Sequence, residues 1–189
     1  IVGNVRRGDM DYWTDWYERY MGFDVIVGFD ESEIYSEYSS LRSVVVGNKS
    51  RSVMLPINEP APSDKRKSQI TMGLESSGGP HVQHIALSAE DICGTVEGLR
   101  SNGIRFMNVP PEYYEISKQA LGSAGIEIEE SWEDLEELGI LVDKGMSGGY
   151  LLQVFTEGIN DSTVRPGTLF FEVISRKSVG GSEPGMGFG

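Results

Sequence analysis

Cysteine and histidine are both scarce in this chain of 189 residues, and each scarcity limits what the protein can be. The single cysteine, Cys93, excludes an internal disulfide and fits a reducing compartment, so we expect a cytoplasmic protein. The two histidines, His81 and His84, are the only imidazole groups that this sequence could offer to a metal ion.

Basic residues and long apolar runs are also in short supply. Lysine and arginine number 16 against 29 acidic residues, which gives a net charge of -13. A surface this acidic repels phosphate backbones, so we expect no nucleic-acid partner. No apolar run approaches the roughly 20 residues that cross a bilayer, so we expect no membrane span. Nothing at the start is typical of a signal peptide, because Ile1 opens directly into a strand-like stretch.

Neither end of the sequence is typical of a natural terminus. There is no initiator methionine, and the stretch Gly180–Gly189 is rich in glycine with no helix after it. We therefore expect the chain to be a fragment of a longer protein.

A strand, a helix and three further strands are predicted in the first third of the chain. Apolar residues recur at helical spacing between Met10 and Met21, and Asp9 and Gly22 are suitable residues to begin and end this helix. Alternating apolar residues and turn signals predict the strands, which lie at Ile1–Val5, Asp24–Phe29, Tyr38–Val46 and Ser52–Ile57.

The same order of elements recurs after residue 80. A helix with Ile92, Val96 and Leu99 on one face ends at Gly103, and Ser88–Asp91 resembles a capping box in front of it. The strands of this second copy are predicted at Val82–Leu87, Arg105–Val109, Tyr150–Thr156 and Thr168–Arg176.

This repeat predicts an α+β fold of two βαβββ modules whose curved sheets form an open, barrel-like cavity. We expect a first module at residues 1–60 with its first strand truncated, a polar linker at 61–79, and a second module at 80–189 with a truncated tail. A largely helical insertion is expected at about residues 110–144. Seven of the eleven residues Glu127–Glu137 are acidic, but the spacing of Trp132, Leu135 and Leu138 favours a solvated helical face over a cation site.

Two side chains are unusual for their predicted positions. His84 lies inside a strand, where a histidine is often an ordinary core residue. Glu172 lies in the middle of an apolar strand, and a buried carboxylate is costly unless it is paired or coordinates an ion. An ion pair with Arg100 or Arg176 would satisfy Glu172 without any metal.

Together, one imidazole and one carboxylate on separate strands of such a module are two members of a facial triad. Two histidines and one carboxylate leave open positions on iron for substrate and oxygen. Alignment of the two copies places Ile1 opposite Ile85, so the counterpart of His84 is the residue directly before Ile1, outside the sequence. His81 is expected to be an exposed loop residue.

Six stretches occur in an order that resembles the 4-hydroxyphenylpyruvate dioxygenase family, which has the vicinal-oxygen-chelate fold. Each stretch is a weak signal alone, but together they run along nearly the whole chain. They are Ile1–Val5, Leu55–Pro60, Lys65–Ile70, Val82–Leu87, Gly149–Thr156 and Leu169–Ile174.

The resemblance implies an Fe(II) site made by His84, Glu172 and a histidine directly before Ile1. It also implies a set of hydrogen-bonding residues, of which the glutamines are catalytic, and a set of aromatic residues that line the pocket for the substrate ring. The hydrogen-bonding residues are Gln69, Gln83, Gln153, Ser43 and Asn58, and the aromatic ones are Phe155, Phe170 and Phe188.

The activity implied by the resemblance is conversion of 4-hydroxyphenylpyruvate, a 2-oxo acid, and dioxygen to homogentisate and CO2 in tyrosine catabolism. The full-length protein would be a homo-oligomer, and the isolated fragment would bind iron weakly and turn over little. The family's first histidine, its C-terminal helix and its N-terminal domain are not in this sequence, and Glu157–Gly167 is longer than the family's usual turn. Three alternatives stay open: 4-hydroxymandelate synthase, a non-catalytic ligand-binding protein of the same fold, and a metal-dependent isomerase or lyase of the glyoxalase type.

Overall fold

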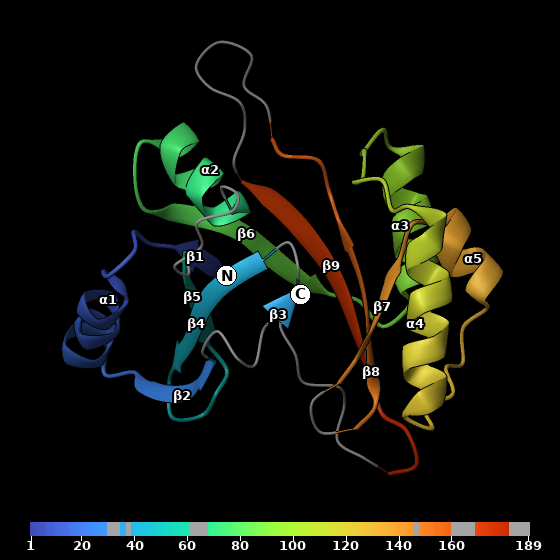
Figure 1. Ribbon diagram of the computed structural model, residues 1–189, viewed down its shortest axis with the longest axis horizontal. Helices are drawn as coiled ribbons and strands as arrows, with labels where there is room; N and C mark the ends of the chain where they lie inside the picture. The colour runs from blue at the N-terminus through green and yellow to red at the C-terminus, as the bar shows by residue number, and fades with distance from the viewer. Residues whose placement is uncertain (30–34, 37–38, 61–67, 146–147, 160–168, 182–189) are drawn as a thin grey trace. The chain divides into compact units, whose positions relative to one another are not determined.

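The computed structural model describes residues 1–29, 35–36, 39–60, 68–145, 148–159 and 169–181. The chain divides into two compact units, each of which is built from two segments of the sequence. The first unit comprises residues 1–85 and 158–170, and the second comprises residues 86–157 and 171–189. Both units contain helices packed on β-strands, as the α+β prediction requires (Figure 1).

The first unit is a sheet with the strand order β2-β4-β5-β1-β6. Strand β1 runs parallel to β5 and antiparallel to β6, and the short β3 pairs with β4. Helix α1 lies against β4 and β5, whereas α2 lies against β1 and β5. The elements are β1 (Val2–Asn4), α1 (Met10–Trp16) with its π-helical extension (Tyr17–Met21), β2 (Asp24–Phe29), β3 (Tyr35–Ser36), β4 (Ser39–Gly47), β5 (Met54–Pro60), α2 (Gln69–Ser77) and β6 (His81–Ser88).

The predicted helix at residues 10–21 is confirmed, and it ends at Gly22, whose φ of 64° is in the left-handed region that glycine tolerates. Its start differs from the prediction. Asp9 occupies the N-cap position but its side chain accepts no capping hydrogen bond. The acceptor at the helix start is Glu59 of β5, whose Oε2 accepts from the backbone N–H groups of Gly8 at 3.0 Å and Met10 at 3.2 Å.

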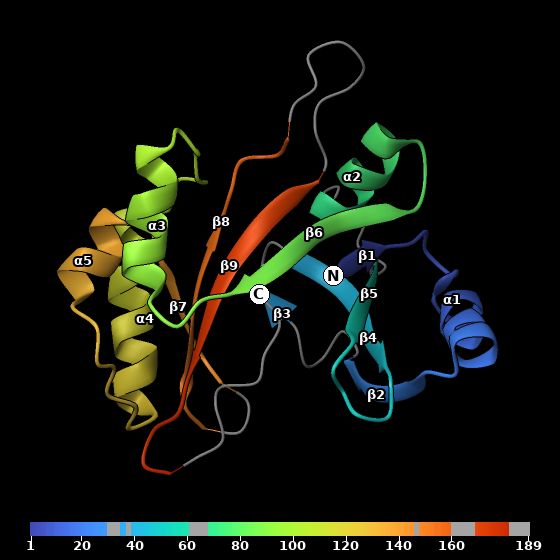
Figure 2. The ribbon, with the colours of Figure 1, turned by 180° about the vertical axis from the view of Figure 1, so that it is seen from behind.

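The second unit has the strand order β9-β8-β7, with antiparallel neighbours. Its three helices lie together on one side of β7 and β8 (Figures 1 and 2). A core of buried apolar side chains, with Leu135, Ile140 and Leu152 at its centre, joins the helices to the strands. The elements are α3 (Ile92–Ser101), α4 (Pro111–Ser123), α5 (Trp132–Glu137), β7 (Leu141–Lys144), β8 (Tyr150–Phe155) and β9 (Phe170–Lys177).

Several local predictions for the second unit are wrong. The expected strand at 105–109 is reduced to one bridge between Phe106 and Thr156. The cap of α3 is Asp91, which accepts from the N–H of Gly94 at 3.0 Å, and not Ser88. Strand β7 was not predicted at all. One prediction outside the second unit is also wrong: residues 69–77, which lie in the predicted linker at 61–79, form helix α2.

The acidic segment forms the predicted helix α5, with Leu135 and Leu138 buried and the acidic side chains mainly toward solvent. Glu130 is an exception, because it accepts from the hydroxyl of Tyr150 at 2.7 Å and pairs with Lys177 at 2.9 Å. Burial opposes ionisation of Glu130, but these two donors outweigh it and lower the pKa of its carboxyl group.

Strand alternation determines which predicted site residues share a face. Tyr150, Leu152 and Val154 of β8 belong to the core under the helices, so Gln153 and Phe155 point to the opposite face of the strand. In the first unit, Val44 of β4 packs with the core beneath α1, and its neighbour Ser43 points the other way.

Across the described parts of the chain, the structure contains no helix with the length and apolar character of a membrane span.

Candidate active site

His84 is buried in β6, with 4% of its surface exposed, opposite Val2 of β1. Its Nδ1 lies 3.0 Å from Oε1 of the neighbouring Gln83. Because an amide oxygen can only accept, this bond places the ring proton on Nδ1 and leaves the lone pair on Nε2. The ring of Phe170 stacks on the imidazole, with centroids 5.0 Å apart and planes at 26°. The hydrogen bond and the stacked ring thus fix the tautomer and the orientation of the imidazole.

Replacing Gln83 by leucine in the full-length protein is expected to weaken metal binding by roughly 10- to 100-fold, since the ring loses the acceptor that holds its tautomer. Titration of the metal-free protein with Fe(II) under anaerobic conditions measures this affinity. Gln83→Glu keeps an acceptor and should retain the affinity. Gln119→Leu, at an exposed glutamine of α4, is the matched control. An unchanged affinity in Gln83→Leu would show that the glutamine does not orient the ring.

Glu172 lies in β9 of the second unit and exposes only 2% of its surface. It is directly opposite Phe155 of β8, and Gln153 lies two residues along the same face. The sheet register therefore brings three predicted site residues onto one face, away from the helices. This arrangement follows from strand alternation alone, and it agrees with the roles that the sequence predicts for them.

The two arginines considered as ion-pair partners of Glu172 differ in their surroundings. Arg100 of α3 donates to the carbonyl oxygens of Glu137 at 3.3 Å and Leu138 at 3.0 Å. These bonds satisfy backbone acceptors at the C-terminal end of α5. Arg176 lies in the same strand as Glu172, and burial lowers the pKa of its guanidinium group while the charge of Glu172 raises it. The charge of Glu172 therefore acts on Arg176, and Arg100 is engaged elsewhere.

Gln153 is 3% exposed and donates from Nε2 to Oδ2 of Asp143 in β7 at 2.6 Å. Its Oε1 is buried and has no hydrogen-bond partner among the residues that the structure describes. A buried acceptor of this kind is costly unless a ligand or water supplies a donor. This observation supports a ligand-binding role for Gln153.

Polar residues also cross the sheet of the first unit in one row. Ser43 of β4 is opposite Asn58 of β5, which is in turn opposite Asn4 of β1. The Oγ of Ser43 and the Oδ1 of Asn4 are buried and have no hydrogen-bond partner within the described ranges. Residues directly opposite one another share a face, so Ser43 and Asn58 lie together as their predicted roles require.

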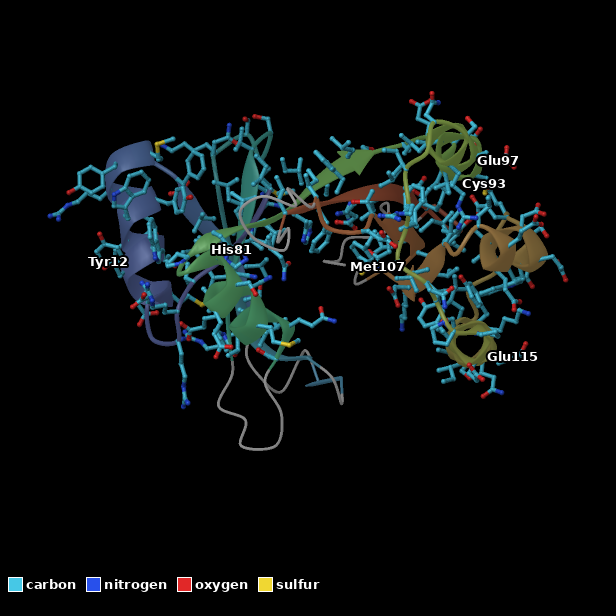
Figure 3. The ribbon with its side chains drawn as sticks, turned by 90° about the horizontal axis from the view of Figure 1, so that it is seen from above. Tyr12, His81, Cys93, Glu97, Met107 and Glu115 are labelled. Carbon is cyan, nitrogen blue, oxygen red and sulfur yellow. The ribbon has the colours of Figure 1, made fainter. Side chains whose placement is uncertain are left out.

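His81 begins β6 beside α2 and is half-buried, so the prediction of an exposed loop residue is wrong (Figure 3). Its Nδ1 lies 3.1 Å from the carbonyl oxygen of Gly79, and its Nε2 is 3.5 Å from Nδ2 of Asn4. A Cβ at Gly73 of α2 would come within 3.1 Å of this ring. Close packing of α2 on the strands explains the partial burial of His81.

Two predicted pocket residues receive less support from their positions. Gln69 is the first residue of α2, directly after the capping Ser68, and its side chain is exposed. Phe188 lies outside the described residues. Their pocket roles stay predictions.

The two predicted metal ligands belong to separate units, His84 to the first and Glu172 to the second. Their convergence on one ion therefore stays a prediction. Within the described residues, no group of three or more histidine, cysteine, aspartate and glutamate side chains is placed to hold a metal. Sequence reasoning missed Asp143, the hydrogen-bond partner of the predicted site residue Gln153, because strand β7 was itself not predicted.

Comparison with known proteins agrees with this assignment of the fold. The model of the glyoxalase/bleomycin resistance protein/dioxygenase superfamily matches residues 2–130. The chain is 46% identical over 178 residues to the 4-hydroxyphenylpyruvate dioxygenase of Sus scrofa, covering 94% of this chain and 44% of that protein. It is 43% identical over 178 residues to the enzyme of the same name from Danio rerio, covering 94% of this chain and 43% of that protein. The chain thus spans less than half the length of these relatives.

Solved structures with the same fold include two proteins of different activity. A mutant 4-hydroxymandelate synthase from Streptomyces coelicolor superposes with a TM-score of 0.72 at 27% identity, over all of this chain and 49% of that one. A methylmalonyl-CoA epimerase from Mycobacterium tuberculosis superposes with a TM-score of 0.52 at 16% identity, over 92% of this chain and 83% of that one. The second similarity concerns the fold alone and confirms the vicinal-oxygen-chelate architecture.

Proposed function

Because the chain belongs to the glyoxalase/bleomycin resistance protein/dioxygenase superfamily, we propose that it forms the greater part of the catalytic domain of a 4-hydroxyphenylpyruvate dioxygenase. The reaction is conversion of 4-hydroxyphenylpyruvate and dioxygen to homogentisate and CO2. The observation that carries this proposal is 46% identity to the pig enzyme of that name across 94% of the chain. The orientation of His84 and the buried carboxylate of Glu172 support it independently.

The residues present fit an Fe(II) site. His84 offers a lone pair on Nε2, because Nδ1 is bonded to Gln83, and Glu172 offers a buried carboxylate. One carboxylate and two neutral imidazoles are the ligands of non-haem Fe(II) oxygenases, and the family resemblance implies the second imidazole at the position before Ile1. Bound Fe(II) would supply coordination positions for the 2-oxo acid and dioxygen, and the electrons that activate oxygen.

The protein residues bind and orient the substrate. A site with one carboxylate and a divalent ion keeps a net charge of about +1, which favours an anionic keto acid. Gln153 and Ser43 present buried oxygen atoms that can accept hydrogen bonds without adding charge. Phe155, beside Glu172 in the sheet register, offers an apolar surface for the aromatic ring.

The test of the proposed function is product analysis with the full-length protein. Purified protein loaded with Fe(II) is incubated with 4-hydroxyphenylpyruvate and oxygen, and the products are identified by mass spectrometry. Homogentisate is expected, together with one CO2 for each substrate consumed. 4-Hydroxymandelate would instead identify a synthase that hydroxylates the benzylic carbon. Substrate binding without turnover would identify a non-catalytic binding protein.

Location and assembly are part of the same proposal. The single thiol, Cys93 on α3, is half-buried (Figure 3). Burial and then the charge of Asp91 raise its pKa, which makes it poorly reactive. The proposed location is the cytoplasm, because one cysteine cannot form an internal disulfide. The full-length protein is proposed to be a homo-oligomer, and a monomeric mass by light scattering would contradict that.

A further inference from the structure

The hydrogen bond between Gln153 and Asp143 determines which end of the Gln153 amide faces a ligand. A carboxylate accepts hydrogen bonds and cannot donate them. The Nε2 of Gln153 must therefore face Oδ2 of Asp143, which it approaches to 2.6 Å. The Oε1 atom then points away from Asp143, and it is buried without a hydrogen-bond partner among the residues described.

We propose that Asp143 is the positioning residue of Gln153: it holds the amide so that the site presents an acceptor, and not a donor, to the bound ligand. An amide that is not held in this way can rotate by half a turn and exchange the two functions at almost no steric cost. The inference rests on the proposed function only in assigning Gln153 to the substrate site. It requires the ligand group that meets Gln153 to be a hydrogen-bond donor, from the substrate or from a water molecule.

The position of Asp143 is fixed by the pairing of β7 with β8 and by a tyrosine of α4. Leu141 is opposite Gln153 and Asp143 is opposite Leu151, so the carboxylate and the amide are diagonal neighbours on one face. The hydroxyl of Tyr113 in α4 donates to the carbonyl oxygen of Val142 and accepts from its N–H, both at 2.9 Å. These two bonds secure β7 directly beside Asp143.

Two opposing effects act on the charge of Asp143. The residue as a whole is exposed, but desolvation of its carboxyl group by the protein raises the pKa of that group. The hydrogen bond from Gln153 opposes this increase by favouring the carboxylate. The bond to Gln153 thus stabilises the ionised form, which is the form that can only accept.

The first test follows the amide itself and needs no turnover. In full-length protein labelled with 15N-glutamine, the two Nε2 protons of Gln153 are identified by their loss in Gln153→Ala. Wild-type protein should show two well-separated proton shifts that move as Asp143 titrates. Asp143→Leu should bring the two shifts together. Identical spectra of Gln153 in the wild type and Asp143→Leu would overturn the inference, whatever reaction the protein catalyses.

The second test measures the consequence for the substrate. In Asp143→Leu, kcat/KM for 4-hydroxyphenylpyruvate should fall about tenfold and anaerobic binding of the substrate should weaken to match. Asp143→Asn still has a carbonyl oxygen that can accept, so its loss should be about two- to threefold. Lys144→Leu, at the next residue of β7, is the control for disturbing this strand.

A double-mutant cycle separates positioning from a general structural effect. If Asp143 acts through Gln153, then Asp143→Leu should cause no further loss of kcat/KM or of substrate affinity in the Gln153→Ala background. An equal tenfold loss in both backgrounds would overturn the inference. A wild-type protein that makes no homogentisate would refute the proposed function alone, because the amide spectra still decide the role of Asp143.

Discussion

Replacement of Glu172 by glutamine in the full-length protein is expected to abolish stoichiometric iron binding and to lower turnover about 1,000-fold. An amide is a much weaker ligand for Fe(II) than a carboxylate. Loss of the ion also removes several kcal/mol of stabilisation from the reaction, and every 1.36 kcal/mol corresponds to about tenfold in rate. The substitution keeps the size of the side chain at this buried position of β9. Metal analysis of the purified protein and oxygen uptake in the presence of substrate measure the two effects.

Glu59→Gln is the matched control for this prediction. Glu59 is also a buried strand carboxylate, with 4% of its surface exposed, but its partners are the start of α1 and Arg42. We expect it to lower stability and to leave the iron content unchanged. If Glu172→Gln retained one iron per chain, or if both variants lost iron equally, Glu172 would not be a ligand.

Replacement of Glu59 by alanine is expected to lower the free energy of unfolding by about 3 kcal/mol. The carboxylate accepts from the N–H groups of Gly8 and Met10 and from Nη1 of Arg42 at 2.9 Å. Alanine leaves these donors without their acceptor, and it removes a negative charge from the N-terminal end of α1, where the helix dipole favours one. Unfolding in urea, followed by the fluorescence of Trp13 and Trp16 in α1, measures the change.

Asp11→Ala provides the comparison, because Asp11 approaches the other terminal nitrogen, Nη2, of the same arginine. The Asp11–Arg42 contact is 3.7 Å long, and the two side chains are 86% and 41% exposed. Exposed ion pairs contribute at most about 1 kcal/mol, so this variant should lose far less stability than Glu59→Ala. Similar losses in both variants would show that burial of Glu59 and its bonds to the helix start do not matter.

The local predictions succeeded where one sequence signal was strong. Apolar residues at helical spacing predicted α1 and α3, and the alternating pattern predicted β2, β6 and β8 nearly to their observed ends. They failed where signals were short or mixed. Strand β7 has four residues, two of them charged, and α2 lies in a polar stretch with little apolar periodicity. Contacts with neighbouring elements decide such segments.

Helix N-caps were likewise only partly predictable from the sequence. Asp9 has the right type and position for an N-cap, but the donors at the start of α1 are instead satisfied by Glu59, about 50 residues away. For α3, the capping residue is Asp91 and not the first residue of the apparent Ser88–Asp91 box. Sequence spacing limits which side chains can cap a helix. Which of them accepts the hydrogen bond depends on the three-dimensional positions of the side chains near the helix start.

The sequence by itself predicted the class of chemistry: one histidine and one glutamate inside apolar strands predict a metal site, and the motifs around them resemble those of a dioxygenase family. What only the tertiary structure decided is how these groups are held. The amide of Gln83 selects the tautomer of His84, and Asp143 selects the orientation of Gln153. Sequence order can predict that two residues lie on one strand face, but a hydrogen bond also depends on strand register and side-chain rotamers, which packing determines.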